Sequence, residues 1–89
     1  IKSGNKFLVY PNPVKEQLNV EFPESHRNGT IRLISTIGEV VYSARINSDN
    51  KHTIDVTNLS SGNYVVEIES LTGNRQRTMV LIQRKEPKP

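Results

Sequence analysis

The feature that most constrains this chain is a series of short segments in which apolar and polar residues alternate. Turn-forming residues separate these segments at a spacing of roughly ten positions. Alternation with a period of two places every second side chain on the same face, which is typical of a half-buried strand. The clearest example runs from Leu18 to Phe22, where the apolar residues alternate with Asn19 and Glu21. No long segment has the helical period of about 3.6 residues, so the pattern predicts an all-β chain.

The alternation predicts seven short strands, at residues 7–10, 18–22, 31–35, 40–46, 53–56, 64–69 and 78–83. Seven strands at this spacing favour an immunoglobulin-like antiparallel β-sandwich. A chain of 89 residues is expected to form one domain. We assign residues 1–6 to a linker, 7–85 to the sandwich and 86–89 to a tail. The chain begins with Ile1, not Met, so we expect it to be part of a longer precursor.

In the expected strand 40–46, the residues predicted to share one face are Val40, Tyr42, Ala44 and Ile46. The last strand differs, because consecutive apolar residues occupy both of its faces, from Met79 to Ile82. Such a strand is predicted to be central in its sheet or covered on its outer face. Its apolar character also leaves pairing between two copies of the chain open.

Two short motifs lie between strands. Tyr10 is followed by Pro11, Asn12 and Pro13, and each proline fixes its own φ and lacks an N–H group. This motif is predicted to form a rigid corner between strands or a hook that a partner recognises. Gly38 is expected in the turn at residues 36–39.

The second motif is the segment from Leu59 to Tyr64. Leu59 is predicted to pack into the core, and Gly62 is predicted to adopt a positive φ that other residues rarely adopt. Tyr64 is expected to point inward, with its hydroxyl bonded to the backbone of the preceding loop, as in a tyrosine corner.

Positive charge is concentrated at the end of the chain. Residues 75–89 carry five basic residues and one acidic residue, whereas the net charge of the whole chain is +3. This basic segment is either an attachment point for an acidic partner or an edge strand that its charges keep from aggregating.

The sequence offers little for catalysis or ligand binding. The chain has no cysteine, and its two histidines, His26 and His52, fall in or beside polar segments. His52 and Asp55 occupy positions of opposite parity on one strand, so a triad with a serine is not expected. We therefore expect no enzymatic activity, cofactor, metal site or nucleic-acid binding, and no apolar run is long enough for a transmembrane segment.

The order and spacing of the motifs resemble the C-terminal sorting domains of the type IX secretion system (the Por secretion system) of Bacteroidetes. The resemblance covers residues 7–85, and its matching segments are 10–14, 18–23, 31–34, 38–41, 55–68 and the basic last strand. It implies an immunoglobulin-like sandwich that directs a cargo protein through the outer-membrane translocon. The implied partners are the type IX translocon, shuttle proteins and a sortase-like signal peptidase that cleaves ahead of the domain.

The resemblance also implies a location: the periplasm in transit, then the outer membrane and cell surface, or the medium. The residues that it marks as candidates for recognition are Val80, Leu81, Ile82, Arg84 and Lys85. The alternative function is that of a non-catalytic structural or adhesive module of a surface protein.

Overall fold

The computed structural model describes residues 7–46 and 50–83, which contain seven β-strands and one short 3-10 helix. Their bounds are β1 Leu8–Tyr10, β2 Gln17–Glu21, η1 Glu24–His26, β3 Thr30–Ser35, β4 Val40–Arg45, β5 Lys51–Asp55, β6 Gly62–Glu69 and β7 Arg75–Ile82. The predicted all-β class is confirmed. The segment expected to be a loop after Phe22 differs from the prediction only in containing η1.

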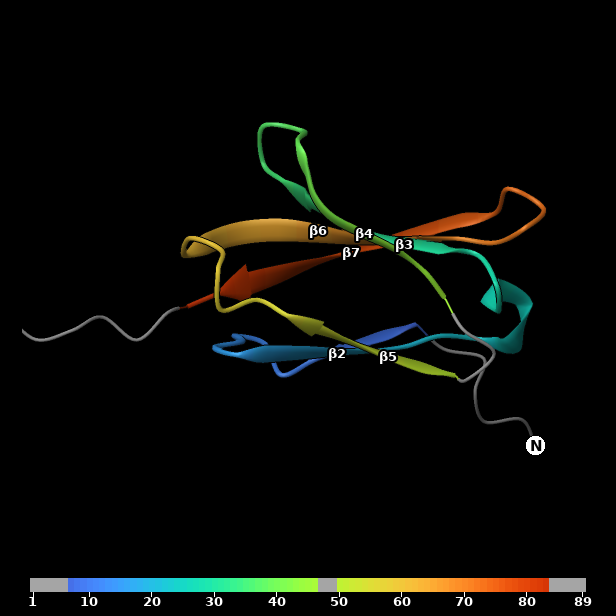
Figure 1. The fold of residues 1–89 in the computed structure, drawn as a ribbon, viewed down its shortest axis with the longest axis horizontal. Coiled ribbons are helices and arrows are strands. Elements are labelled where there is room, and N and C mark those ends of the chain that lie inside the picture. The colour runs from blue at the N-terminus through green and yellow to red at the C-terminus, as the bar shows by residue number, and fades with distance from the viewer. Residues whose placement is uncertain (1–6, 47–49, 84–89) are drawn as a thin grey trace, which may run out of the picture.

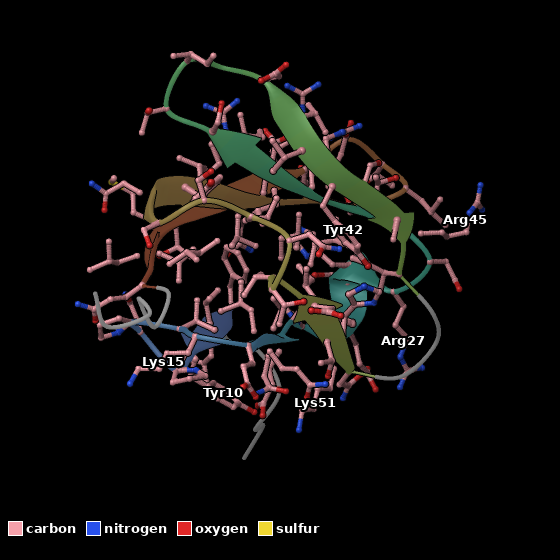
Figure 2. The ribbon with its side chains drawn as sticks, turned by 60° about the vertical axis from the view of Figure 1, so that its left-hand side comes forward. Tyr10, Lys15, Arg27, Tyr42, Arg45 and Lys51 are labelled. Carbon is pink, nitrogen blue, oxygen red and sulfur yellow. The ribbon has the colours of Figure 1, made fainter. Side chains whose placement is uncertain are left out.

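The strands form two sheets that stack as separate layers (Figure 1). One sheet has the order β1-β2-β5 and the other β4-β3-β6-β7, and all pairings between these strands are antiparallel. Side chains from both layers fill the space between them (Figure 2). The predicted β-sandwich is therefore confirmed.

The core consists of the side chains that alternation directs inward from both sheets. It contains Val14, Leu18, Val20, Phe22, Ile31, Leu33, Ile46, Ile54, Val56, Tyr64, Val66, Ile68, Val80 and Ile82. Removing each aliphatic side chain of this kind from water stabilises the fold by about 1.5–3 kcal/mol, which offsets the entropy lost by ordering the chain.

The prediction that β7 is central in its sheet is wrong, and no described part of the chain covers the outer face of β7 at Met79. β7 lies at the edge of the four-stranded sheet, and the side chain of Met79 on its outer face is 57% exposed. Val80 and Ile82 point into the core, whereas Met79 and Leu81 alternate with them and face away from it.

The prediction for Val40 is also wrong. Leu33 pairs with Tyr42 but Ile34 pairs with Val40, so a β-bulge shifts the register between β3 and β4. A bulge inserts one residue and breaks the period of two. Val41 therefore packs against the core, while Val40 is 51% exposed.

The part of the chain that the structure describes contains no helix with the length and apolarity needed to cross a membrane.

Candidate recognition site

The segment 11–14, which connects β1 to β2, crosses to the edge of β7, and we call it the strap. The Oδ1 atom of Asn12 accepts a hydrogen bond from the N–H of Leu81 at 3.0 Å. The N–H of Val14 donates to the carbonyl oxygen of Leu81 at 2.9 Å, and the N–H of Gln83 donates to that of Val14 at 2.8 Å. Val14 and Ile82 also form a parallel bridge. The strap thus links the three-stranded sheet to β7, an edge strand of the four-stranded sheet.

This geometry gives the proline motif a structural role. Pro11, Asn12 and Pro13 are exposed, and both prolines follow cis peptide bonds. The exposed Asn12 nevertheless uses its side-chain oxygen to satisfy a backbone donor of β7. The motif therefore forms a corner that positions the strap against the last strand.

The residues predicted for recognition on β7 lie next to the strap. Val80 and Ile82 are 1% and 0% exposed, so their side chains are part of the core. Leu81 is half-buried, and its peptide groups are bound by the strap. Arg84 and Lys85 lie outside the described residues. The recognition role of these residues remains a prediction, and a partner could reach Val80 or Ile82 only if the sandwich opened locally.

The second motif has the predicted geometry. Leu59 is half-buried against the core, and Gly62 has a φ of +149°. The hydroxyl of Tyr64 donates to the carbonyl oxygen of Ser60 at 2.8 Å, and this bond connects the loop to the beginning of β6. Gly38 has a φ of +88° in the turn between β3 and β4. These glycines and the tyrosine therefore shape the loops of the sandwich.

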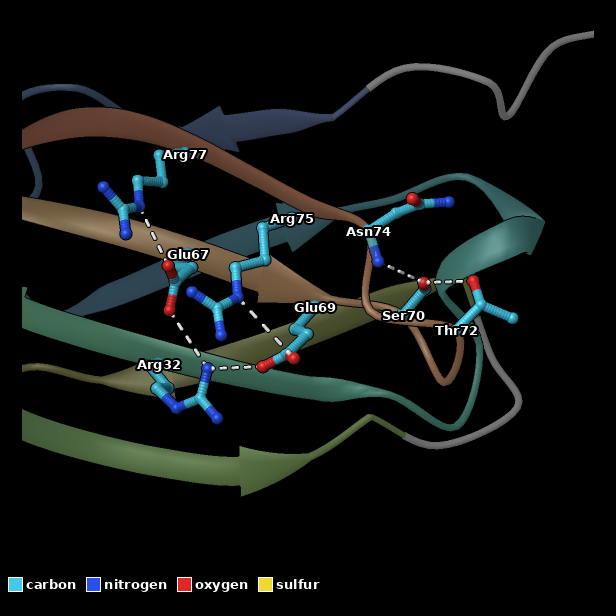
Figure 3. Close-up of polar contacts among 8 residues, drawn as sticks. All are labelled: Arg32, Glu67, Glu69, Ser70, Thr72, Asn74, Arg75 and Arg77. Atoms are coloured by element: carbon cyan, nitrogen blue, oxygen red, sulfur yellow. Dashed lines mark hydrogen bonds and ion pairs between the residues drawn. The ribbon is translucent and has the colours of Figure 1, made fainter.

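The outer face of the four-stranded sheet carries a cluster of five charged side chains (Figure 3). Nη1 of Arg32 lies 3.0 Å from Oε1 of Glu67 and 3.0 Å from Oε1 of Glu69. Nε of Arg77 lies 2.8 Å from Oε2 of Glu67, and Nε of Arg75 lies 3.6 Å from Oε2 of Glu69. We call these five residues the outer-face charge cluster. Three arginines against two glutamates leave it with a net positive charge.

Glu67 is at the centre of this cluster, with a side chain that is 5% exposed. Burial by itself would raise the pKa of its carboxyl group, but hydrogen bonds from Arg77 and Arg32 hold this pKa below its ordinary value. Alternation along β6 places Glu67 on the outer face, away from the inward-facing Val66 and Ile68. Alternation does not reveal that two arginines from neighbouring strands cover the carboxylate.

At the edge of the sandwich opposite to β7, Tyr42 of β4 contacts His52 of β5. The hydroxyl oxygen of Tyr42 lies 2.8 Å from Nε2 of His52, and the ring centroids are 6.1 Å apart. Figure 2 places Tyr42 between the two layers. Burial lowers the pKa of His52 and raises that of Tyr42. This contact joins the two sheets along the side where β4 and β5 form their edges.

The groups that a hydrolytic triad would need are not brought together in the described residues. Oδ1 of Asp55 accepts hydrogen bonds from the N–H and hydroxyl of Thr57, at 3.0 and 2.7 Å, and these bonds lower its pKa. His26 is buried elsewhere, with Nδ1 3.2 Å from Oγ of Ser25. Within residues 7–46 and 50–83, no group of three or more acidic or histidine side chains is placed to hold a metal ion.

The stacked sheets and the tyrosine corner define the class as an immunoglobulin-like β-sandwich. A model of the secretion system C-terminal sorting domain matches residues 8–83. The chain therefore belongs to the family of secretion system C-terminal sorting domains. Membership implies contact with the secretion machinery and export of the parent protein to the cell surface or the medium.

Solved structures share the fold. PorZ, an essential bacterial surface component of the type IX secretion system of Porphyromonas gingivalis, superposes with a TM-score of 0.74 and 15% identity. The match covers 88% of this chain and 11% of the PorZ chain, so this domain corresponds to a small part of PorZ. No protein with a curated description matches the chain in sequence.

Two further structures are similar over most of the chain. A DUF3244 family protein of Bacteroides vulgatus with an immunoglobulin-like β-sandwich fold has a TM-score of 0.71 and 21% identity, and the match covers 86% of this chain and 84% of that one. CopC of Methylosinus trichosporium OB3b has a TM-score of 0.51 and 14% identity, with 94% and 100% covered. These likenesses extend the sandwich class beyond the sorting domains.

Proposed function

We propose that this domain is a C-terminal signal that directs a cargo protein through the type IX translocon in the outer membrane. The single observation that carries the proposal is the family match over residues 8–83, which spans both sheets of the sandwich. The domain passes through the periplasm with its cargo, and shuttle proteins and the translocon bind it. A sortase-like peptidase then removes it at the cell surface by cleaving ahead of the sandwich.

In this proposal the domain acts by binding and carries out no chemistry. The dispersal of His26, His52 and Asp55 over separate environments supports this view. So does the use of the apolar residues to fill the space between two sheets. Recognition then depends on groups at the surface of a folded sandwich, on sheet edges and on charged side chains.

The direct test is a fusion of residues 1–89 to the C-terminus of a periplasmic reporter, expressed in a strain that has the secretion system. We expect the reporter on the cell surface or in the medium. The matched controls are the reporter without the domain and the same fusion in a strain without the translocon, which should both stay in the periplasm. Retention of the fusion in the periplasm of the competent strain would contradict the proposal.

The second candidate is a structural or adhesive module of a surface protein. The DUF3244 structure favours it, because there the same sandwich makes up most of a chain that is not described as a sorting domain. This candidate predicts that the parent protein reaches the surface when residues 7–85 are deleted. The sorting proposal predicts that the deletion traps the parent protein in the periplasm.

A further inference from the structure

The first half of β7 has an open backbone edge. In an antiparallel pair, the peptide groups of alternate residues point toward the partner strand or away from it. Leu81 points away from β6, because its N–H and carbonyl groups both bond to the strap. At the other end, Asn74 points toward the β6 side, since its carbonyl accepts from the N–H of Ser70 at 2.8 Å. Arg75, Arg77 and Met79 have the same parity as Leu81, so their peptide groups also point away from β6.

No strand of the described chain covers these three residues, which we call the open edge. Among residues 7–46 and 50–83, β7 forms a ladder only with β6, and the strap reaches no further along β7 than Leu81. Unpaired N–H and carbonyl groups at a sheet edge are a template for an added strand. The strap thus closes one half of the edge of β7 and leaves the other half free.

The side chains of the open edge end three rows that cross the outer face of the sheet. The register aligns Arg32, Glu67 and Arg77 in one row, in which positive and negative charges alternate. The next row places Glu69 opposite Arg75. Both charged rows end at the open edge on an arginine, whose side chains are 56% exposed for Arg75 and 62% exposed for Arg77.

The third row is apolar. Val40, Ile34, Val65 and Met79 are cross-strand partners in sequence across all four strands. Met79, which is 57% exposed, ends this row at the open edge. A strand added there would continue each row, so an acidic side chain is favoured opposite each arginine and an apolar one opposite Met79.

We infer that the open edge is the docking site for an extended, antiparallel segment of a partner protein. That segment carries an apolar residue and then two acidic residues at alternate positions, facing Met79, Arg77 and Arg75 in turn. The inference rests on the proposed function, because it assigns this segment to a protein that recognises the sorting domain during export.

A second copy of the chain does not supply such a segment. The other edge strands described are β1, β4 and β5, and none has acidic residues at two alternate positions. Pairing two β7 edges would bring the arginines of one copy against the arginines or Met79 of the other. Like charges directly opposite each other are unfavourable. Residues 84–89 carry three basic residues and one acidic residue, so their charge is also of the wrong sign.

The binding test uses the 89-residue chain and a synthetic peptide, Thr-Val-Thr-Glu-Thr-Glu-Thr, with amide hydrogen exchange followed residue by residue by NMR. We expect the peptide to protect the amides of Arg75, Arg77 and Met79. A matched peptide with lysine in place of both glutamates should bind more weakly, by roughly two- to fivefold for each lost charge pair.

Two variants of the exposed residue Met79 distinguish the contribution of its backbone N–H to peptide binding from that of its side chain. Met79→Pro removes an N–H that points away from β6, so it blocks the added strand and keeps the ladder of β7. Met79→Thr retains this N–H. We expect the proline variant to lose peptide binding and the threonine variant to keep most of it, with thermal unfolding showing that both are folded.

If Met79→Pro does not fold, Arg75→Glu replaces it, because Arg32 still neutralises Glu69 in that variant. This variant should lose the preference for the glutamate peptide, because each peptide then places one side chain opposite an unlike charge and one opposite a like charge. The inference is overturned if the folded proline variant binds as well as the threonine variant, or if the Arg75→Glu variant keeps the full preference for the glutamate peptide. It is also overturned if protection appears on β1, β4 or β5, or if no peptide binds.

The reporter fusion distinguishes this inference from the proposed function. Export with Met79→Thr and retention with a folded Met79→Pro supports both. Export with both variants overturns the role of the open edge and leaves the sorting function intact. Failure of the unaltered domain to export the reporter overturns the sorting function, while the peptide experiment still decides whether the edge binds acidic strands.

Discussion

The side chain of Tyr64 contributes both to the core and to the conformation of the loop before β6. Its ring belongs to the core and is 7% exposed, while its hydroxyl donates to the carbonyl oxygen of Ser60. The ring removes apolar area from water, and the hydroxyl fixes the path of the loop that enters β6. The two contributions can be measured separately, because phenylalanine keeps the first and removes the second.

We expect Tyr64→Ala to lower the free energy of unfolding by about 3–5 kcal/mol, because it leaves a cavity in a small core. Tyr64→Phe should lower it by about 1 kcal/mol, which is the typical net contribution of one hydrogen bond. Urea denaturation of both variants measures these values. Equal losses for the two variants would show that the hydroxyl, not the ring, is the important group.

Gly29 is a second single residue on which the stability of the domain depends. A Cβ atom at this position would lie 1.9 Å from the carbonyl oxygen of Glu69, which belongs to the backbone of β6 and cannot move independently. We expect Gly29→Ala to destabilise the domain by about 1–3 kcal/mol or more, as overpacking does. The neighbouring Asn28 has a φ of +64°, so Asn28→Gly is a control that should change stability little in thermal unfolding. A Gly29→Ala variant as stable as this control would contradict the steric argument.

At the scale of elements, the contact between the strap and β7 connects the two sheets at one edge of the sandwich. The strap joins a segment from the three-stranded sheet to the edge of the four-stranded sheet, and Tyr42 and His52 join the sheets on the other side. The strap also protects the half of β7 that holds Val80 and Ile82. Its contribution depends largely on backbone hydrogen bonds and on one side-chain oxygen, that of Asn12.

We expect Asn12→Ala to lower the free energy of unfolding by about 0.5–1.5 kcal/mol, because the N–H of Leu81 loses its acceptor. Hydrogen exchange at the Leu81 amide should become faster in this variant. Asn12→Asp retains an oxygen in the same place and is the matched control, with exchange close to that of the unaltered chain. Unchanged exchange in Asn12→Ala would mean that the backbone bonds of Val14 alone hold the strap.

At the scale of the whole molecule, two titratable groups, the half-buried His52 and the buried Glu67, make stability depend on pH. His52 lies between the sheets, and burial lowers its pKa in the folded state. Glu67 lies beneath two arginines, which lower its pKa against the opposing effect of burial. In both cases the unfolded chain binds the proton more readily, so acid favours unfolding.

For His52, the loss of stability begins as the pH falls below about 6.5, the ordinary pKa of histidine, and is complete below the lowered pKa of the folded state. We expect the difference in stability between the unaltered chain and His52→Gln to change across this range and to be constant above it. For Glu67, the corresponding loss begins only below about pH 4.3. Denaturation series at fixed pH values measure both. A difference for His52→Gln that is independent of pH would contradict the burial argument.

The family and the export of the parent protein follow from the same match, whereas the proposed docking of a partner strand rests on surface groups. The open edge offers Arg75, Arg77 and Met79 to that partner, and the strap withholds Leu81 from it. These residues lie in the basic segment that the sequence indicates, but on its exposed first half, not among Val80, Leu81 and Ile82.

The sequence by itself determined the strands, most of the core and the tyrosine corner. These features depend on alternation and on turn chemistry, which act between residues a few positions apart. The inward positions of Leu18, Val20 and Tyr64 could therefore be predicted.

Only the tertiary structure decided the edge position of β7, the bulge that exposes Val40 and the burial of Glu67. The same holds for the contact between Asn12 and Leu81, which are 69 residues apart in the chain. Such features depend on which strands become neighbours and in which register. A local pattern of period two is satisfied equally by a central strand and by an edge strand, so it cannot distinguish between them.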